Sequence, residues 1–295
     1  MSEQQWDGRS RGTRFGHAIF IKLIKIGGLQ PAYFLLRFVA QYYIWFVPKA
    51  TRPLHDLYRN RLKFSPRDTR RLIRKNIRYF GQTLIDKAAV LYTRSDRQFR
   101  ITHLGEQALE DMVQAGKGGI LLSAHLGNWE MSGALLTKYD HVYNIVMFEG
   151  EEGSIREYMN SEGLERRFNI IYIKEDMSHI YEMSAALNRN EFICMHADRF
   201  MAGNRTIEGV FLDRPARFPL GPFVLASKLR APVSFVFAMK EEGNAYSFYA
   251  TPARVFEGRG MDGAQQMLGA YIAELTEKLH RYPHQWFNYY YFWEA

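Results

Sequence analysis

The sequence predicts a layered α/β fold: a mixed, mainly parallel sheet covered by helices, preceded by a basic, apolar helical segment at the N-terminus. Short apolar runs alternate with helical stretches from residue 101 onward, which is typical of such a sheet. The 295 residues, 47% of them hydrophobic, are enough for a substantial core. Residues 1–100 carry 21 Lys and Arg against 6 Asp and Glu, a net charge of +15, and the rest carries 18 against 25, or −7.

The N-terminal segment is the most apolar part of the chain. Within residues 17–48, Lys22, Lys25 and Arg37 interrupt the apolar residues, so the stretch does not predict a spanning helix. A Gly-Gly pair and a proline break it, which predicts a short helix, a bend and a second helix at about 32–47 lying in or dipping into a membrane. Two core helices of a soluble domain are the alternative.

A long helix is predicted from Ser65-Pro66 to about Tyr92, because Ser can cap the helix and Pro fits its first turn. Arginines recur along one face at steps of three and four residues, opposite an apolar stripe. A solvated face and a contact with lipid headgroups explain this charge equally well. We therefore divide the chain into a basic, apolar, membrane-associated segment at 1–60 and a core domain at 61–295.

The remaining elements follow from the apolar runs. Strands are predicted at 118–124, 143–148, 169–173, 191–197 and 231–239, and helices at 128–138, 154–167, 177–188, 220–229 and 262–281. A further strand at 246–256 is predicted to be antiparallel and near an edge, because Pro252 would disturb a central strand.

The segment GGILLSAHLGNWEMSGALL carries the candidate chemistry. A buried strand ends at Ala124, His125 follows at its carboxyl end, Asn128 can cap the next helix, and Glu130 falls in that helix's first turn. Reaction sites in open α/β sheets collect at this edge. There His125 can act as a general base, Glu130 can hold its tautomer, and free N–H groups at the helix start can stabilise an oxyanion.

No motif in the sequence supports disulfide, zinc, serine-hydrolase or nucleotide chemistry. Cys194 is the single cysteine, which excludes an internal disulfide and a cysteine-based zinc cluster, and we predict no metal site. No serine-hydrolase elbow, phosphate loop or H-E-x-x-H occurs. The G-x-G-x-x-G at 258–263 has no second parallel strand after its helix, so it predicts a turn and a helix start.

The block HLGNWE, the strand ending CMHADR, the stretch FLDRPARFPLGPFVLASKLRAPV and the C-terminal YPHQWF together resemble the bacterial late acyltransferases of lipid A biosynthesis, within the lysophospholipid acyltransferase superfamily. The resemblance covers most of the chain and implies a glycerolipid acyltransferase-like fold. The chain departs from the family pattern in its last residues, NYYYFWEA, and in the residues after Asp198, which bears on the acceptor more than on the reaction.

The resemblance also implies roles for residues. His125 is the catalytic base, Glu130 its partner, Asp198 and Arg199 a second block lining the site, and Arg166 or Arg167 a basic residue near the acceptor. Without the resemblance, Asp198 and Arg199 are more simply explained as an ion pair, and His196 as a packed core residue. Five arginines are expected as a group to contact phosphates, although each alone is more simply a solvated surface cation. They are Arg166, Arg167, Arg205, Arg214 and Arg217. Together with Asn128, these residues are the predicted substrate-binding set.

The predicted activity is transfer of a fatty acyl group to a hydroxyl or amine of a membrane lipid. The resemblance implies an acyl carrier protein or coenzyme A thioester as donor, with no other cofactor. It also implies a lipid A precursor, a lysolipid, an amino-acid lipid or a polyene lipid as acceptor, at the cytoplasmic face of the bacterial inner membrane. The basic N-terminal third predicts contact with an anionic membrane rather than nucleic acid. The alternatives are a non-catalytic membrane or nucleic-acid binding protein and a hydrolase that passes the acyl group to water.

Overall fold

The structure is a computed structural model, and it describes residues 14–93, 99–129, 131, 141–148, 168–201 and 203–294. The helix predicted at 154–167 lies outside these residues, as does all but the start of the helix predicted at 128–138. Both stay predictions, as does the division of the chain near residue 60.

The described helices are α1 (Arg14–Gly27), α2 (Leu29–Phe46), α3 (Pro48–His55), a π-helical turn (Asp56–Arg61), α4 (Pro66–Thr93), α5 (Glu106–Gln114), α8 (Ser178–Asn188), α9 (Leu220–Leu229), α10 (Met261–Arg281) and two 3-10 turns, Pro283–Gln285 and Phe292–Glu294. The strands are β1 (Arg100–Leu104), β2 (Gly119–Ser123), β3 (Tyr143–Met147), β4 (Phe168–Tyr172), β5 (Phe192–His196), β6 (Thr206–Phe211), β7 (Arg214–Pro219), β8 (Val233–Lys240) and β9 (Ala245–Ala250).

Seven of these strands form one sheet in the order β1-β9-β8-β2-β5-β3-β4. Neighbours are parallel except β8 and β9, which are antiparallel. The predicted mixed, mainly parallel sheet is therefore confirmed, and β2, β3, β4, β5 and β8 lie within two residues of their predicted bounds. The strand predicted at 246–256 is β9, which is antiparallel as expected, ends before Pro252 and lies one place from the edge strand β1.

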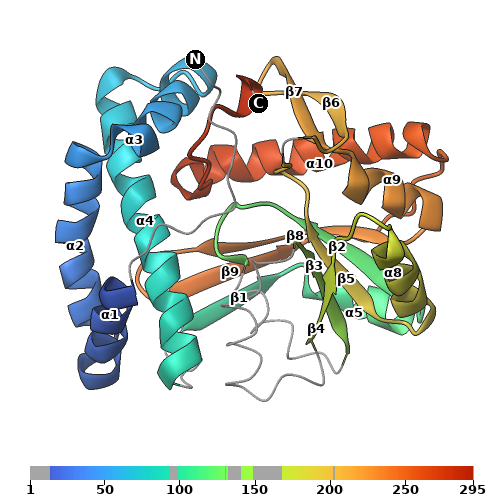
Figure 1. Cartoon of the computed structure of the whole chain (residues 1–295), viewed down its shortest axis with the longest axis horizontal. Helices are drawn as coiled ribbons and strands as arrows, with labels where there is room; N and C mark the ends of the chain where they lie inside the picture. Colours follow the sequence, from blue (N-terminus) through green and yellow to red (C-terminus); the bar gives the residue numbers. More distant parts are fainter. Residues whose placement is uncertain are drawn as a thin grey trace.

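Helices cover both faces of the sheet, because successive side chains of its buried strands point to opposite sides. Ile120 and Leu122 of β2 belong to the core cluster that contains the apolar side of α10. Leu121, between them, belongs to a second cluster with Leu109 and Met112 of α5. Figure 1 shows α10 running along one face of the sheet, with α9 and the β6–β7 hairpin on the same side.

The N-terminal helices form a separate layer at one end of the sheet, where α2 and α4 run side by side (Figure 1). The predicted bend between two helices is confirmed: α1 ends at Gly27, and Gly28 has a φ of +73° that favours glycine. The long helix α4 begins as predicted, with the N–H of Asp68 donating to the Ser65 hydroxyl at 3.1 Å. None of the described helices combines the length and apolarity needed to cross a membrane.

The hairpin β6–β7 and the edge strand β1 were not predicted. The hairpin places Phe211 and Phe218 in the main core cluster, beside Leu268 and Ile272 of α10. Its polar residues face outward, so that the sequence alternates in a pattern typical of a half-buried strand. Arg217 lies on this hairpin, exposed and opposite Glu208 in the register.

Candidate functional site

The site forms where β2 and β5 end side by side. These strands are parallel neighbours in the register Ser123 with His196, so the residues two places beyond, His125 and Asp198, emerge next to one another. The shared carboxyl edge of parallel strands is where α/β proteins place ligands. The sheet thus brings together two residues separated by 73 positions in the chain.

A double contact joins His125 to Asp198. Nδ1 of the His125 ring lies 2.8 Å from Oδ1 of Asp198, and the main-chain N–H of His125 donates to Oδ2 at 3.0 Å. The Asp198 side chain is 1% exposed and the His125 side chain 23% exposed. Because a carboxylate accepts and does not donate, Nδ1 carries the proton in the neutral ring and Nε2 has the free lone pair. This is the arrangement that a general base requires.

Electrostatics keep His125 neutral. Burial and the guanidinium charge of Arg199 lower the pKa of His125 below its usual 6.5, against the opposing effect of Asp198. Burial alone would raise the pKa of Asp198, but the contacts with His125 and the charge of Arg199 outweigh it and hold that pKa well below its usual range. At neutral pH the pair is therefore an imidazole beside a carboxylate.

His196 is packed against the base. Its ring centroid lies 4.4 Å from that of His125 and 4.9 Å from that of Trp129. Burial, with the nearby His125, lowers the pKa of His196 to about 3, so it stays neutral. It was predicted to be a packed core residue, and the structure instead places it half-buried at the site. Among the described residues, His125, His196 and Asp198 could hold a metal ion, with ligand atoms within 4.8 Å of one another, but the 2.8 Å contact already pairs two of them.

The C-terminal segment lies across the turn that carries the base. The Gly127 N–H donates to the carbonyl of Gln285 at 2.9 Å, and the Phe287 N–H donates to the carbonyl of His125 at 3.1 Å. Between them, the indole N–H of Trp286 donates to Oδ2 of Asp198 at 3.1 Å. Trp286 thus holds the carboxylate that contacts the His125 ring. Sequence reasoning assigned it no role; the only signal was the YPHQWF block that contains it.

Two predicted site residues have defined places near the pair. Arg199 donates to the carbonyl of Phe287 at 2.6 Å, beside the turn. Asn128 is buried, and its amide donates to the Tyr246 hydroxyl at 3.1 Å and to the carbonyl of Thr83 at 3.4 Å. Substrate contacts by either residue stay predictions.

Three more predicted residues cannot be placed, since Glu130, Arg166 and Arg167 lie outside the described residues. Glu130 as partner of the base therefore stays a prediction. The N–H groups of Gly127 and Asn128, in the turn before the predicted helix, donate to the carbonyls of Gln285 and Ala238. Oxyanion stabilisation by the N–H groups at the helix start stays a prediction.

The fold and the site define an α/β protein with a histidine–aspartate pair equipped for general-base chemistry. A family model described as bacterial lipid A biosynthesis acyltransferase matches residues 18–293, so the chain belongs to this family, as the resemblance indicated. The chain is also similar to phosphatidylinositol mannoside acyltransferases from two strains of Mycobacterium tuberculosis, with 28% identity over 158 residues and 29% over 164. Each match covers 50% of this chain and 47% of the relative, so the chain spans about half the length of these curated relatives.

Proposed function

We propose that this protein transfers a fatty acyl group from a thioester donor to a hydroxyl of a membrane glycolipid, with His125 as general base. The observation that carries the proposal is the contact of His125 Nδ1 with the buried carboxylate of Asp198, which leaves Nε2 as the basic nitrogen. Family membership supports acyl transfer. The family description and the relatives' names both refer to sugar-bearing lipids, which supports a glycolipid acceptor.

The reaction proceeds by direct transfer. Nε2 of His125 takes the proton of the acceptor hydroxyl as its oxygen attacks the thioester carbonyl. The tetrahedral intermediate collapses, the carbon–sulfur bond breaks, and the thiolate leaves with the proton that the imidazolium returns. The carboxylate of Asp198 stabilises the imidazolium, and no covalent enzyme intermediate is needed. Glu130, predicted as the partner of His125, is the second carboxylate whose contribution must be measured.

The donor is proposed to be an acyl carrier protein or coenzyme A thioester, as in the family. Phe80 and Leu84 of α4 are 36% and 43% exposed, and the Phe80 ring lies 5.2 Å from that of Phe287, whose N–H binds the carbonyl of His125. This exposed apolar surface, linked to His125 through Phe287, is the proposed contact for the acyl chain. Arg166, Arg167, Arg199 and Arg217 are the proposed contacts for anionic groups of the substrates.

The decisive experiment compares lipids from cells with and without the intact gene by mass spectrometry. The species missing without the gene identifies the acceptor and the acyl chain together. Purified His125→Ala should fold, as judged by circular dichroism, and lose transfer to that acceptor. Transfer by this variant at the wild-type rate would refute the mechanism. Salt-sensitive oligonucleotide binding without transfer to any lipid would instead support a binding protein.

We further propose that α1 and α2 dock on the anionic cytoplasmic face of the inner membrane. One side of α2 exposes large apolar side chains between 57% and 69%, and these are Phe34, Phe38, Tyr42, Trp45 and Phe46. Exposed cations occur along the same segment, at Lys22, Lys25, Arg37, Lys49 and Arg52. Residues 8–55 contain no acidic residue, so the whole segment complements an anionic surface.

Vesicle sedimentation tests the docking. The protein should bind vesicles of phosphatidylglycerol and phosphatidylethanolamine more strongly than phosphatidylcholine vesicles, and salt should weaken the binding. Exchanging Phe38 and Trp45 for Ser should reduce binding, whereas Tyr181→Ser, at a side chain 80% exposed on α8, should not. Equal loss in both variants would contradict the assignment of this face.

A further inference from the structure

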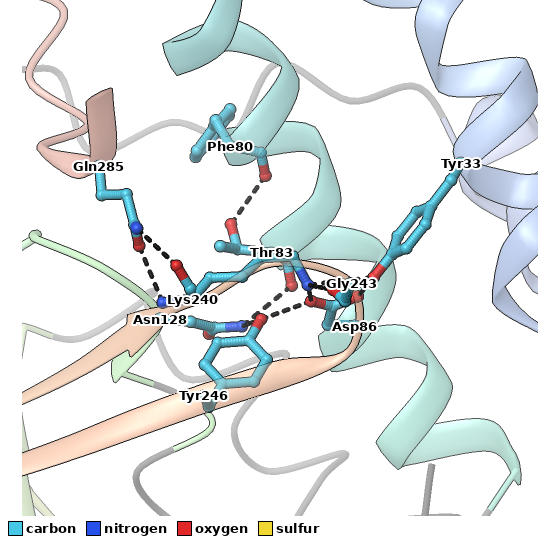
Figure 2. Close-up of polar contacts among 9 residues, drawn as sticks. All are labelled: Tyr33, Phe80, Thr83, Asp86, Asn128, Lys240, Gly243, Tyr246 and Gln285. Carbon is cyan, nitrogen blue, oxygen red and sulfur yellow. Dashed lines mark hydrogen bonds and ion pairs between the residues drawn. The ribbon is translucent and has the colours of Figure 1, made fainter. Parts of the chain in front are cut away.

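We infer that a buried ion pair between Asp86 and Lys240 positions the catalytic turn, residues 125–128, and that Tyr246 is the positioning residue that connects them. The inference rests on the proposed function, because it assigns a task to residues outside the catalytic pair. Asp86 belongs to α4, and Lys240 ends β8; neither touches His125 in the contacts described above. Figure 2 shows the cluster.

The cluster is a fully bonded set of polar groups. The side chains of Asp86 and Lys240 are 0% and 1% exposed, and Nζ of Lys240 lies 2.6 Å from Oδ2 of Asp86. The same ammonium donates to the Tyr33 hydroxyl at 3.2 Å and to the carbonyl of Gly243 at 3.1 Å, which uses all three of its protons. Asp86 also accepts hydrogen bonds from the hydroxyls of Tyr33 and Tyr246.

Such a cluster holds its members in one geometry. Burial raises the pKa of the Asp86 carboxyl, while the Lys240 ammonium and the hydroxyls of Tyr246 and Tyr33 favour the ionised form. A buried charge that lost one partner would be uncompensated, so displacement of any member is costly. The cluster therefore fixes β8 and β9 against α4 and, through Tyr33, against α2.

One connection from the cluster reaches the turn through Tyr246. Its hydroxyl donates to Asp86, which leaves the oxygen to accept the amide N–H of Asn128 at 3.1 Å. The same Asn128 amide reaches the carbonyl of Thr83 on α4 at 3.4 Å. Because the Asp86 carboxylate can only accept, it sets the direction of the hydroxyl, and the hydroxyl in turn holds Asn128, three residues after His125.

A second connection links the backbone of Lys240 to the turn through Gln285. The Lys240 N–H donates to Oε1 of Gln285 at 2.9 Å, and Nε2 of Gln285 donates to the Lys240 carbonyl at 2.7 Å. The Gln285 carbonyl then accepts the N–H of Gly127 at 2.9 Å. The Gln285 amide makes both contacts at once because it has a carbonyl acceptor and an NH2 donor. The turn is thus held at residues 127 and 128 from a single buried point. Figure 2 shows the contacts of Asn128 and of the Gln285 side chain.

The test compares two variants that each remove one hydroxyl from the same carboxylate. Tyr246→Phe removes the acceptor of Asn128, so we expect kcat to fall about 10- to 100-fold with the donor KM nearly unchanged, as for a small misplacement of a base. Tyr33→Phe removes two hydrogen bonds of the cluster but none to the turn. It should lower the melting temperature at least as much, with kcat within about twofold of wild type.

A second readout does not depend on transfer. In labelled protein, the His125 ring signal, assigned with His125→Gln, gives its pKa by NMR titration. Loosening the turn exposes the ring, so Tyr246→Phe should raise that pKa toward 6.5 and Tyr33→Phe should leave it unchanged. Wild-type kcat and His125 pKa in Tyr246→Phe, or equal losses in both variants, would overturn the inference. Absence of any transfer by the wild-type protein would refute the proposed function, and the titration would still judge the positioning.

Discussion

The most direct test of the catalytic pair is Asp198→Asn, a nearly isosteric change at a group that accepts three hydrogen bonds. In the native site, Oδ2 accepts the His125 main-chain N–H at 3.0 Å and the Trp286 indole N–H at 3.1 Å, while Oδ1 faces Nδ1 of His125 at 2.8 Å. An amide has only one acceptor oxygen. Two N–H donors converge on the Oδ2 position, so the oxygen of the introduced amide should take that position and its NH2 group should face Nδ1.

That orientation reverses the histidine tautomer. An NH2 group facing Nδ1 requires a lone pair there and moves the ring proton to Nε2, the nitrogen that should take the acceptor's proton. The wrong tautomer costs about 10⁴ in kcat in the serine-protease triad, and we expect a loss of that order here. This corresponds to about 5.4 kcal/mol of transition-state stabilisation, at about 1.36 kcal/mol per tenfold. The two bonds at Oδ2 survive, so the fold should remain intact.

The assay is single-turnover transfer from a radiolabelled acyl thioester to the acceptor, with circular dichroism and thermal melting as controls for folding. Glu130→Gln is the matched comparison, because it makes the same chemical change at the carboxylate predicted from the sequence. A loss near 10⁴ for Asp198→Asn identifies the orienting group. Activity within about tenfold of wild type for Asp198→Asn, with a large loss for Glu130→Gln, would refute this reasoning and return that role to Glu130.

Three further outcomes are expected. The acid limb of the kcat/KM pH profile should lie below pH 6.5, because the pKa of His125 is lowered. Arg199→Gln should move this limb to higher pH, because it removes a charge that lowers the His125 pKa, whereas Arg199→Lys keeps the charge and should not move it. Lys240→Met should lower the free energy of unfolding in urea by roughly 3–5 kcal/mol, because it leaves the Asp86 charge uncompensated. Adding Asp86→Leu should restore part of that stability, and no recovery would contradict the ion-pair account. Gly127→Ala should destabilise by more than about 1–2 kcal/mol in the same assay, since φ is +79° and a Cβ would lie 2.2 Å from a β8 carbonyl oxygen.

The fold was largely predictable because its central strands are buried on both faces and appear as continuous apolar runs. The strand at 119–123 and its parallel neighbours were recognised from such runs. The edge strand β1 and the hairpin β6–β7 were missed because they lack such runs. Their burial alternates, so each contributes only a few apolar residues to the core. A polar, alternating segment of five or six residues is hard to separate from a loop without knowing what it packs against.

The place of His125 was predictable, whereas its contact with Asp198 was not assigned. His125 follows a buried strand and opens the HLGNWE block, and both features singled it out. Asp198 follows a second strand at the same offset, but the pairing depends on β2 and β5 being neighbours in register, which a strand list does not give. Sequence reasoning chose Glu130, in the predicted first turn of the next helix, and that choice stays a prediction. The role of Trp286 was harder to predict, because its contact with Asp198 depends on how the C-terminal segment packs against the turn.

That return also changes the interpretation of the unusual C-terminal residues. They were expected to bear on the acceptor, which stays a prediction, and their described contacts lie behind His125 and Asp198. The ring of Phe292 lies 5.1 Å from that of Trp286, and Trp293 stacks on Phe211 at 5.6 Å while its indole N–H donates to the Phe211 carbonyl at 3.0 Å. These rings support Trp286, which holds Asp198. We therefore expect the aromatic tail to orient His125 through Trp286 and Asp198, and differences in the tail to alter kcat before they alter which lipid is accepted.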